Sequence, residues 1–118
     1  MRYNWLVAWD IREHVAATGE TPVLGFLEGL KGRPEAAAFA LIELLAEHGN
    51  QLRRPQSGAL GDGLFELRHK ATGVRIFYMF RPGRRVVLLD GMVKKQDKLP
   101  VAMMERLPKA QNDVAASD

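Results

Sequence analysis

The sequence predicts an α+β domain in which an N-terminal strand and two helices pack on one face of a small antiparallel β-sheet, followed by a short C-terminal helix. Between residues 22 and 48, apolar residues recur every three or four positions, as in amphipathic helices. From residue 64 to residue 93, β-branched and aromatic runs alternate with turn signals instead. The 118 residues, 47% of them hydrophobic, suffice for one domain, which we assign to residues 1–108.

The first half of the chain predicts one strand and two helices. The run "WLVAWDI", residues 5–11, suits a buried strand. Thr21 is placed to cap a helix that starts at Pro22, and a second helix begins near Pro34 and ends at Gly49. Each helix has an apolar stripe, formed by Val23, Phe26, Leu27 and Leu30 in the first and by Ala38, Leu41, Ile42 and Leu45 in the second.

The second half predicts a loop and then a three-stranded meander. Residues 50–63 contain Pro55 and three glycines and are typical of a loop. The strands "LFELRHK", "VRIFYMF" and "RRVVLLDGMV" follow, separated by turns at "TG" and "PG". A short helix then ends at Leu107, because Pro108 interrupts it, and residues 109–118 are predicted to be disordered.

Composition narrows the classes of chemistry. Without cysteine the chain has no disulfide, no thiolate nucleophile and no cysteine metal site. The three histidines are scattered and form no metal-binding motif, so we predict no metal and no cofactor. No run approaches eighteen apolar residues, and the first thirty residues lack the order of a signal peptide, so we expect a cytoplasmic protein without membrane contact.

The charge is unevenly distributed along the chain. Residues 51–100 contain eleven basic and four acidic residues, a net charge of +7, whereas residues 1–50 have a net charge of −3. A positive half on a nearly neutral protein favours a surface for a polyanion such as nucleic acid. The alternative is a charge-rich, solvated sheet without a nucleic-acid partner.

Strand geometry places several of these cations together. A two-residue first turn sets Arg68 opposite Phe77 and Lys70 opposite Arg75, on the face turned away from the helices. Lys94 joins this face if the last strand has no bulge. Basic residues interleaved with an aromatic ring on an open sheet suit an RNA strand, although chance charge pairs across the strands are the alternative.

The strand motifs also resemble a known family. "GLFELR", "GVRIFYMF" and "VVLLDGMVKKQDKLP", after a helix ending in "LLAEHGNQLRRP", are similar to the phage-derived (Gp49-like) branch of the RelE/HigB toxin superfamily, over about residues 5–100. The resemblance implies a RelE-like fold and the toxin of a type II toxin-antitoxin system. Such a toxin is a metal-independent endoribonuclease that cleaves mRNA, usually on the ribosome, inhibits translation, and is held inactive by a helix-turn-helix antitoxin.

The resemblance also implies the site residues. By motif, the catalytic residues are Arg68 in "ELR", Arg75 in "VRIFY", and Lys94 and Lys95 in "VKKQ". The arginines would hold the phosphate while the 2′-hydroxyl of the RNA attacks it, and one lysine would act as base or acid.

Further RNA contacts are expected from Lys70, Phe77 and Lys98, the last at the outer rim. Tyr78 or His69 could supply the other proton of the reaction, but both fall on the face under the helices, where a core role is favoured over a catalytic one.

Two other functions remain open. A ParE-like toxin would poison DNA gyrase with the same fold, and a degenerate toxin would retain only antitoxin or nucleic-acid binding. The antitoxin would contact either the helical surface of residues 22–48 or the basic cleft itself.

Overall fold

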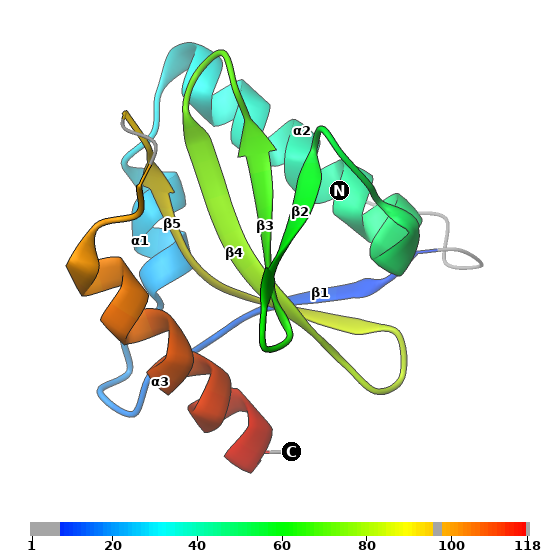
Figure 1. The fold of residues 1–118 in the computed structure, drawn as a ribbon, viewed down its shortest axis with the longest axis vertical. Coiled ribbons are helices and arrows are strands. Elements are labelled where there is room, and N and C mark those ends of the chain that lie inside the picture. Colours follow the sequence, from blue (N-terminus) through cyan, green and yellow to red (C-terminus); the bar gives the residue numbers. More distant parts are fainter. Residues whose placement is uncertain (1–7, 96–97, 118) are drawn as a thin grey trace.

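A five-stranded mixed sheet organises the fold, which a computed structural model describes for residues 8–95 and 98–117 (Figure 1). The strands are β1 (Asp10–Glu13), β2 (Ser57–Gly61), β3 (Leu64–His69), β4 (Val74–Arg81) and β5 (Arg85–Val93). The helices are α1 (Pro22–Glu28), α2 (Gly32–His48) and α3 (Val101–Ser117), with a 3₁₀ turn at Gly49–Gln51. The strand order is β1-β5-β4-β3-β2, with β1 parallel to β5 and the other pairs antiparallel. The predicted α+β class is confirmed.

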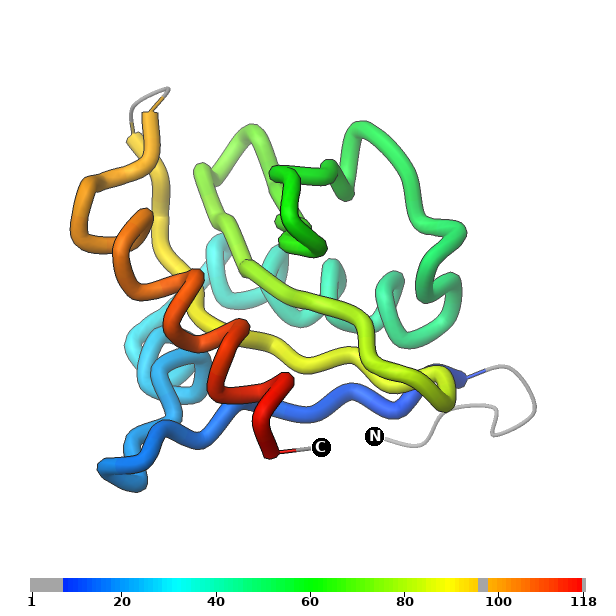
Figure 2. The backbone as a smooth tube through the Cα atoms, turned by 60° about the horizontal axis from the view of Figure 1, so that its bottom comes forward, coloured from blue at the N-terminus to red at the C-terminus, as the bar shows by residue number. Residues whose placement is uncertain are grey.

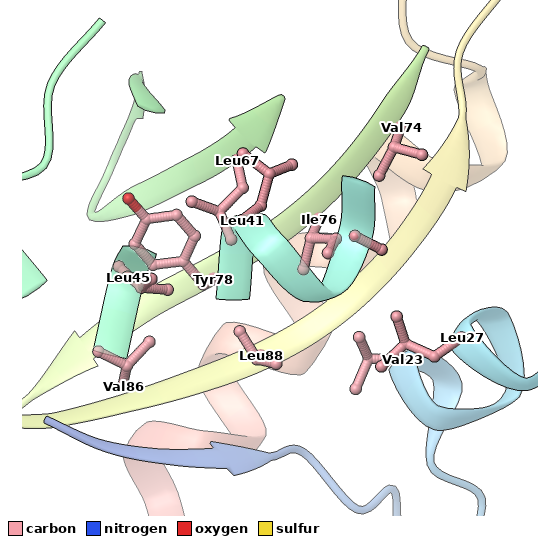
Figure 3. Close-up of a cluster of buried hydrophobic side chains, with 11 residues drawn as sticks. Val23, Leu27, Leu41, Leu45, Leu67, Val74, Ile76, Tyr78, Val86 and Leu88 are labelled. Atoms are coloured by element: carbon pink, nitrogen blue, oxygen red, sulfur yellow. The ribbon is translucent and has the colours of Figure 1, made fainter. Parts of the chain in front are cut away.

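Helices α1 and α2 cover one face of the sheet and enclose the main core. Leu41 and Leu45 of α2 pack with Leu67, Ile76 and Tyr78 of the central strands (Figure 3). All five side chains are almost completely buried. The helical stripe and the strand alternation therefore point the predicted residues into the same core.

Helix α3 covers part of the opposite face, so the sheet lies between two helical layers (Figure 2). The sheet contributes Phe77, Met79 and Leu89 to this second core, and α3 contributes Leu107 and Val114 among others. The sequence analysis expected this face to be open. That expectation is wrong over the area under α3, because the C-terminal helix is long enough to reach across the strands.

The C-terminal segment differs from its prediction. Helix α3 continues through Pro108 to Ser117, so residues 109–117 are helical rather than disordered. Pro108 is exposed, and Met104, whose carbonyl loses its helical hydrogen bond to the missing N–H, is also exposed, so this carbonyl is not sealed in the core. Buried contacts at Leu107 and Val114, on either side of the proline, hold the helix on the sheet.

Two strands also differ from their predictions. Strand β1 starts at Asp10, where pairing with β5 begins opposite Arg85, and the described residues Ala8 and Trp9 of the predicted strand lie before it. The rest of that prediction, residues 5–7, lies outside the described residues. Strand β2 lies within the predicted loop and pairs with β3. Its sequence, "SGALG", has small residues with weak strand preference, so its pairing depends on the neighbouring strand rather than on composition.

Both hairpin turns are longer than predicted, yet the side chains of β3 and β4 keep their predicted faces. Arg68 lies opposite Arg75 rather than Phe77, a shift of two residues. In the second hairpin, Arg75 lies opposite Met92 rather than Asp90, because the turn has three residues and β5 bulges opposite Phe77 and Tyr78. The total shift is even for Arg68, Arg75 and Asp90, which keep their predicted face. Between the turn and the bulge the shift is one residue, so Val86 and Leu88 of β5 point into the main core rather than to the face of Phe77.

Some features do not occur in the described part of the chain. None of its helices is long and apolar enough to span a membrane. Its histidine, aspartate and glutamate side chains do not gather in threes that could hold a metal ion.

Truncation of Leu107 tests the packing of α3. Leu107→Ala should lower the free energy of unfolding by about 2 to 5 kcal/mol, because it leaves a cavity in the second core. Met104→Ala, on the exposed side of the same helix, should change it by less than about 0.5 kcal/mol. Urea denaturation measures both, and equally small effects would contradict the docking of α3.

Candidate active site

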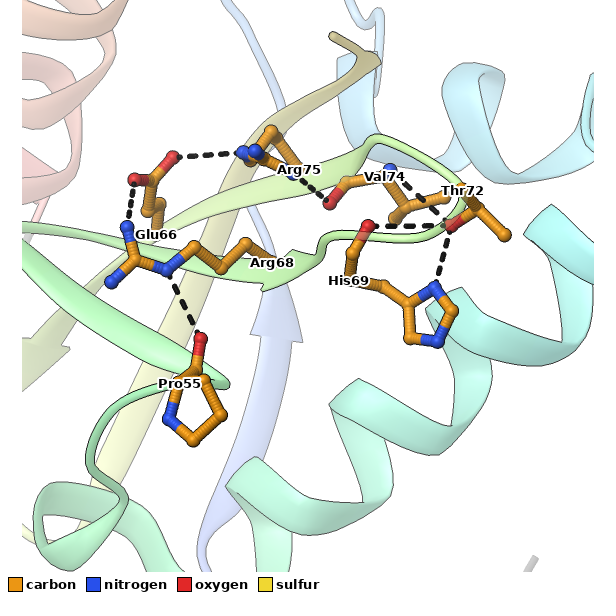
Figure 4. A network of polar contacts seen from close by, with 7 residues as sticks. All are labelled: Pro55, Glu66, Arg68, His69, Thr72, Val74 and Arg75. Atoms are coloured by element: carbon orange, nitrogen blue, oxygen red, sulfur yellow. Dashed lines mark hydrogen bonds and ion pairs between the residues drawn. The ribbon is translucent and has the colours of Figure 1, made fainter. Parts of the chain in front are cut away.

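A buried carboxylate holds two arginines together on the sheet surface (Figure 4). Arg68 of β3 and Arg75 of β4 are direct cross-strand neighbours, and Glu66 precedes Arg68 by two residues on the same face. Nη1 of Arg68 lies 3.3 Å from Oε2 of Glu66, and Nε of Arg75 lies 3.6 Å from Oε1. Opposed like charges would repel, so Glu66 is what allows the two guanidinium groups to share this position.

Backbone groups fix the orientation of both arginines. Arg68 donates from Nε to the Pro55 carbonyl at 3.0 Å, and Arg75 donates from Nη1 to the Val74 carbonyl at 3.1 Å. Gly58 of β2 leaves room for Arg68, because a Cβ at this position would lie 3.0 Å from Nη2. The absence of a side chain in the weak strand β2 therefore has a role in shaping the site.

Arg75 carries an incompletely satisfied donor. Its Nε is buried and has no hydrogen-bond partner among residues 8–95 and 98–117, since the 3.6 Å ion pair with Glu66 is longer than a hydrogen bond. A buried donor left in this way lowers the stability of the fold. In native proteins such groups call for an explanation, and a binding or catalytic role is one.

The arginines open onto a pocket of about 370 Å³ that also has Arg54, Pro55 and Lys70 on its walls. In the described part of the chain, Nη2 of Arg68 and Nη2 of Arg75 have no hydrogen-bond partner. Four cations therefore converge on this pocket: Arg68 from β3, Arg75 from β4, Lys70 from the turn between them, and Arg54 from the segment before β2. The pocket has the chemistry to bind a phosphate.

Lys94 lies beside the β3–β4 turn. Its backbone N–H donates to the Gly73 carbonyl at 2.7 Å. Gly73 has a φ of +80°, and a Cβ there would lie 2.5 Å from the Lys94 carbonyl oxygen, so glycine permits this close approach. The structure thus brings the end of β5 next to the turn that contains Lys70.

The three lysines after β5 are less well gathered than the arginines. Lys94 is half-buried and Lys95 is exposed, but neither lines the arginine pocket. Lys98 is exposed beyond residues 96–97, which lie outside the described residues. The predicted roles of these lysines therefore rest on their proximity to the turn.

The predicted RNA contact of Phe77 is wrong, whereas Lys70 lines the pocket. Phe77 is 0% exposed and packs with Leu89 and Met103 under α3. Sequence reasoning placed it on the correct face but did not foresee a long helix over that face. No base can stack on this ring.

Asp90 is paired with α3 rather than with Arg75. Its Oδ2 accepts hydrogen bonds from Nε and Nη2 of Arg106 at 3.3 and 3.1 Å, and its Oδ1 accepts one from the Gly91 N–H at 2.8 Å. The bulge in β5 sets Asp90 opposite Phe77, next to the helix. This arrangement leaves Glu66 as the carboxylate partner of Arg75.

Tyr78 lies on the other face of the sheet, as expected of a core residue. It is 1% exposed, and its hydroxyl is 2.6 Å from Oγ of Ser57. Burial raises the pKa of the Tyr78 phenol above its ordinary value, and the hydrogen bond with Ser57 acts in the opposite direction. His69 is half-buried, with Nδ1 2.8 Å from Oγ1 of Thr72 in the turn.

Three residues of this region were missed by sequence reasoning. Glu66 stands in the "ELR" motif, but only its burial between two arginines shows its importance. Arg54 belongs to the segment taken as a loop, and its basic neighbour Arg53 was the one available signal. Arg106 was assigned no role because its partner Asp90 lies sixteen residues away.

The fold and this site together define a small α+β domain with an arginine-lined, positively charged pocket on its sheet. The chain belongs to the family of phage-derived Gp49-like proteins (DUF891), whose family model matches residues 25–112. This range includes helix α2, most of helix α3 and all residues that line the arginine pocket. A comparison with curated proteins finds no match.

The buried Tyr78 hydroxyl predicts a pH dependence of stability. Below about pH 10 the contribution of Tyr78 to the free energy of unfolding is fully present, because the phenol is protonated in both states. Above about pH 10 the unfolded state loses this proton first, so the free energy of unfolding falls as the pH rises through the folded-state pKa. At pH 8, Tyr78→Phe should cost about 0.5 to 1.5 kcal/mol because Ser57 loses its partner. In urea denaturation from pH 8 to 11, the difference between wild type and Tyr78→Phe should shrink above pH 10. Parallel curves would contradict a raised pKa.

Proposed function

We propose that this protein is the toxin of a type II toxin-antitoxin system and cleaves mRNA on the ribosome as a metal-independent endoribonuclease, which inhibits translation. The observation that carries the proposal is the pair Arg68 and Arg75, held by Glu66 at the wall of a positively charged pocket of about 370 Å³. Membership of the phage-derived Gp49-like family and the RelE-like α+β fold support it.

The proposed reaction uses a nucleophile that RNA itself supplies. The 2′-hydroxyl loses its proton to a base and attacks the adjacent phosphorus, the bond to the 5′-oxygen breaks, and that oxygen takes a proton from an acid. The products are a 2′,3′-cyclic phosphate and a 5′-hydroxyl end. The free Nη2 groups of Arg68 and Arg75 would stabilise the extra negative charge of the phosphorane.

The lysines complete the proposed mechanism. Lys94 lies beside the β3–β4 turn, so we assign it or Lys95 the transfer of a proton. Lys70 of that turn would contact the RNA backbone, as would Lys98 at the outer rim. If Lys94 alone faces the substrate, Lys95→Ala should lower RNA cleavage less than Lys94→Ala does.

Glu66 is proposed as a positioning residue. Its two oxygens reach Arg68 and Arg75 separately, so its charge sets both the spacing and the orientation of the guanidinium groups. Its side chain is only 7% exposed, which keeps it behind the arginines rather than in front of them. It would thus prepare the phosphate site without contacting the phosphate.

Loss of either arginine tests the phosphate site. Arg68→Ala and Arg75→Ala should each lower RNA cleavage about ten- to a thousandfold and relieve growth arrest when the protein is expressed without an antitoxin. Primer extension on cellular mRNA would measure cleavage as discrete new 5′ ends. Arg33→Ala, at an exposed position of α2, is the matched control and should stay toxic.

Three outcomes would contradict this proposal. Full toxicity of both pocket variants would exclude the assigned site. Growth arrest with DNA breaks and intact mRNA would favour the ParE-like activity, and harmless overexpression of folded protein would favour a module that only binds a partner.

Replacement of Glu66 separates a positioning role from a catalytic one. Glu66→Gln keeps the shape but removes the charge that restrains both arginines, so we expect the KM for RNA to rise several-fold. The pH profile of kcat should keep its shape, because Glu66 transfers no proton in the proposal. A lost acidic limb in that profile would instead identify Glu66 as the general base. Urea denaturation of the same variant would show whether the fold is intact.

The proposal implies a cytoplasmic protein with a cognate helix-turn-helix antitoxin. An exposed stripe of α2 containing Phe39, Glu35 and Glu47 is one surface that such a partner could cover, and the arginine pocket is the other. A small helix-turn-helix reading frame beside this one would support the toxin assignment directly.

A further inference from the structure

A second pocket lies where the edge strand β2 meets the end of α2, on the face of the sheet opposite the arginine pocket. We name it the edge pocket; its volume is about 600 Å³. Phe65, Tyr78 and Phe80 form its aromatic side, Ser57 and Ala59 line it from β2, and Arg53 and Arg54 flank it. Neither the proposed mechanism nor the core packing assigns this space a role.

The walls of the edge pocket suit a flat aromatic group. Phe65 and Tyr78 are stacked with ring centroids 5.6 Å apart, and Phe80 lies edge-on to Phe65 at 5.1 Å. Phe65 and Phe80 are only partly buried, so they present ring surface to the pocket. Such a fixed aromatic wall is the kind of surface on which unpaired bases stack.

The polar floor of the edge pocket has hydrogen-bonding capacity left over. The hydroxyls of Ser57 and Tyr78 share one hydrogen bond, 2.6 Å long, which uses one of their two protons. In the described part of the chain neither hydroxyl has another partner. The pair therefore keeps one donor proton and several lone pairs for the edge of a base.

Arg54 connects the edge pocket to the arginine pocket. It lines both and, among the described residues, makes no hydrogen bond or ion pair. Its neighbour Arg53 is anchored through Nη1 to the Asn50 carbonyl at 2.6 Å. A nucleic-acid strand that crosses the sheet edge here would keep its backbone next to a cation between the two pockets.

We infer that the edge pocket binds an unpaired nucleobase of the RNA whose neighbouring phosphate occupies the arginine pocket. The inference rests on the proposed function and adds a subsite to it. The base would stack on Phe65 with Phe80 at its edge, and the Ser57 and Tyr78 hydroxyls would recognise it. Arg54 would contact the RNA backbone between the two pockets. Charge favours this occupant over an apolar protein side chain, because both arginines at the rim are positive.

Filling the edge pocket provides a direct binding test. Ala59 is exposed and lies opposite Phe65 on β2, so Ala59→Trp puts an indole into the pocket without altering the core. Leu60→Trp, at the next position of the same strand and not on the pocket wall, is the matched control. Each of the four nucleoside 5′-monophosphates would be titrated into wild type and variants, with NMR signals of Ser57 and the Tyr78 ring as the readout.

At least one nucleotide should shift these signals in the wild type and in Leu60→Trp, with at least tenfold weaker binding in Ala59→Trp. No shift with any nucleotide, or equal shifts in both tryptophan variants, would overturn the inference.

Cleavage of a mixed-sequence RNA separates the subsite from the nuclease proposal. If the subsite is correct, Ala59→Trp should flatten the base preference at one position near the cut, whereas Leu60→Trp should keep it. If Ala59→Trp is active and its base preference is unchanged, the subsite is rejected and the nuclease proposal is retained. If nucleotides bind at Ser57 and Tyr78 but the protein cleaves no RNA, the nuclease proposal is rejected and the edge pocket is retained as a nucleotide-binding site.

Discussion

The structure depends on one buried carboxylate that holds two like charges side by side. Glu66 contacts Arg68 on its own strand and Arg75 on the next, and without this negative charge directly opposed guanidinium groups would repel. A charge with so little access to water is stable only if it is paired, so each of the three residues requires the others. Among the described residues, the same arrangement leaves an Nη2 group on each arginine without a partner. The interaction that stabilises the cluster therefore also orients the arginines for the proposed contact with a phosphate.

A second charge pair determines what the sheet face exposes. Arg106 of α3 binds Asp90 of β5, and the apolar side of the helix buries Phe77 beneath it. This helix closes the part of the face near β5 and leaves the arginines of β3 and β4 open. Because Asp90 is occupied by α3, it does not neutralise Arg75. On one surface, Asp90 therefore has a structural role with α3, and Glu66 has the proposed functional role with the arginines of the pocket.

Small residues in β2 connect the two faces of the sheet. Gly58 leaves space for Arg68 on one face, while Ser57 bonds the Tyr78 hydroxyl on the other. Their neighbour Arg54 lines both pockets. These same residues made the segment resemble a loop, since glycine, serine and alanine have little strand preference. The segment that was hardest to predict therefore contributes to both proposed binding sites.

Much of the fold and part of the site were determined by the sequence itself. Helical spacing in residues 22–48 and alternation in residues 64–93 are local properties, and side chains stay on their faces under a register shift of two, so Arg68 and Arg75 were correctly grouped. The turn lengths, the bulge in β5, the pairing of β2, and the extension of α3 past Pro108 were not foreseen. Each depends on contacts between segments far apart in the chain. For the same reason only the tertiary structure revealed Glu66 between its arginines, buried Phe77 under α3, and placed Arg54 at both pockets.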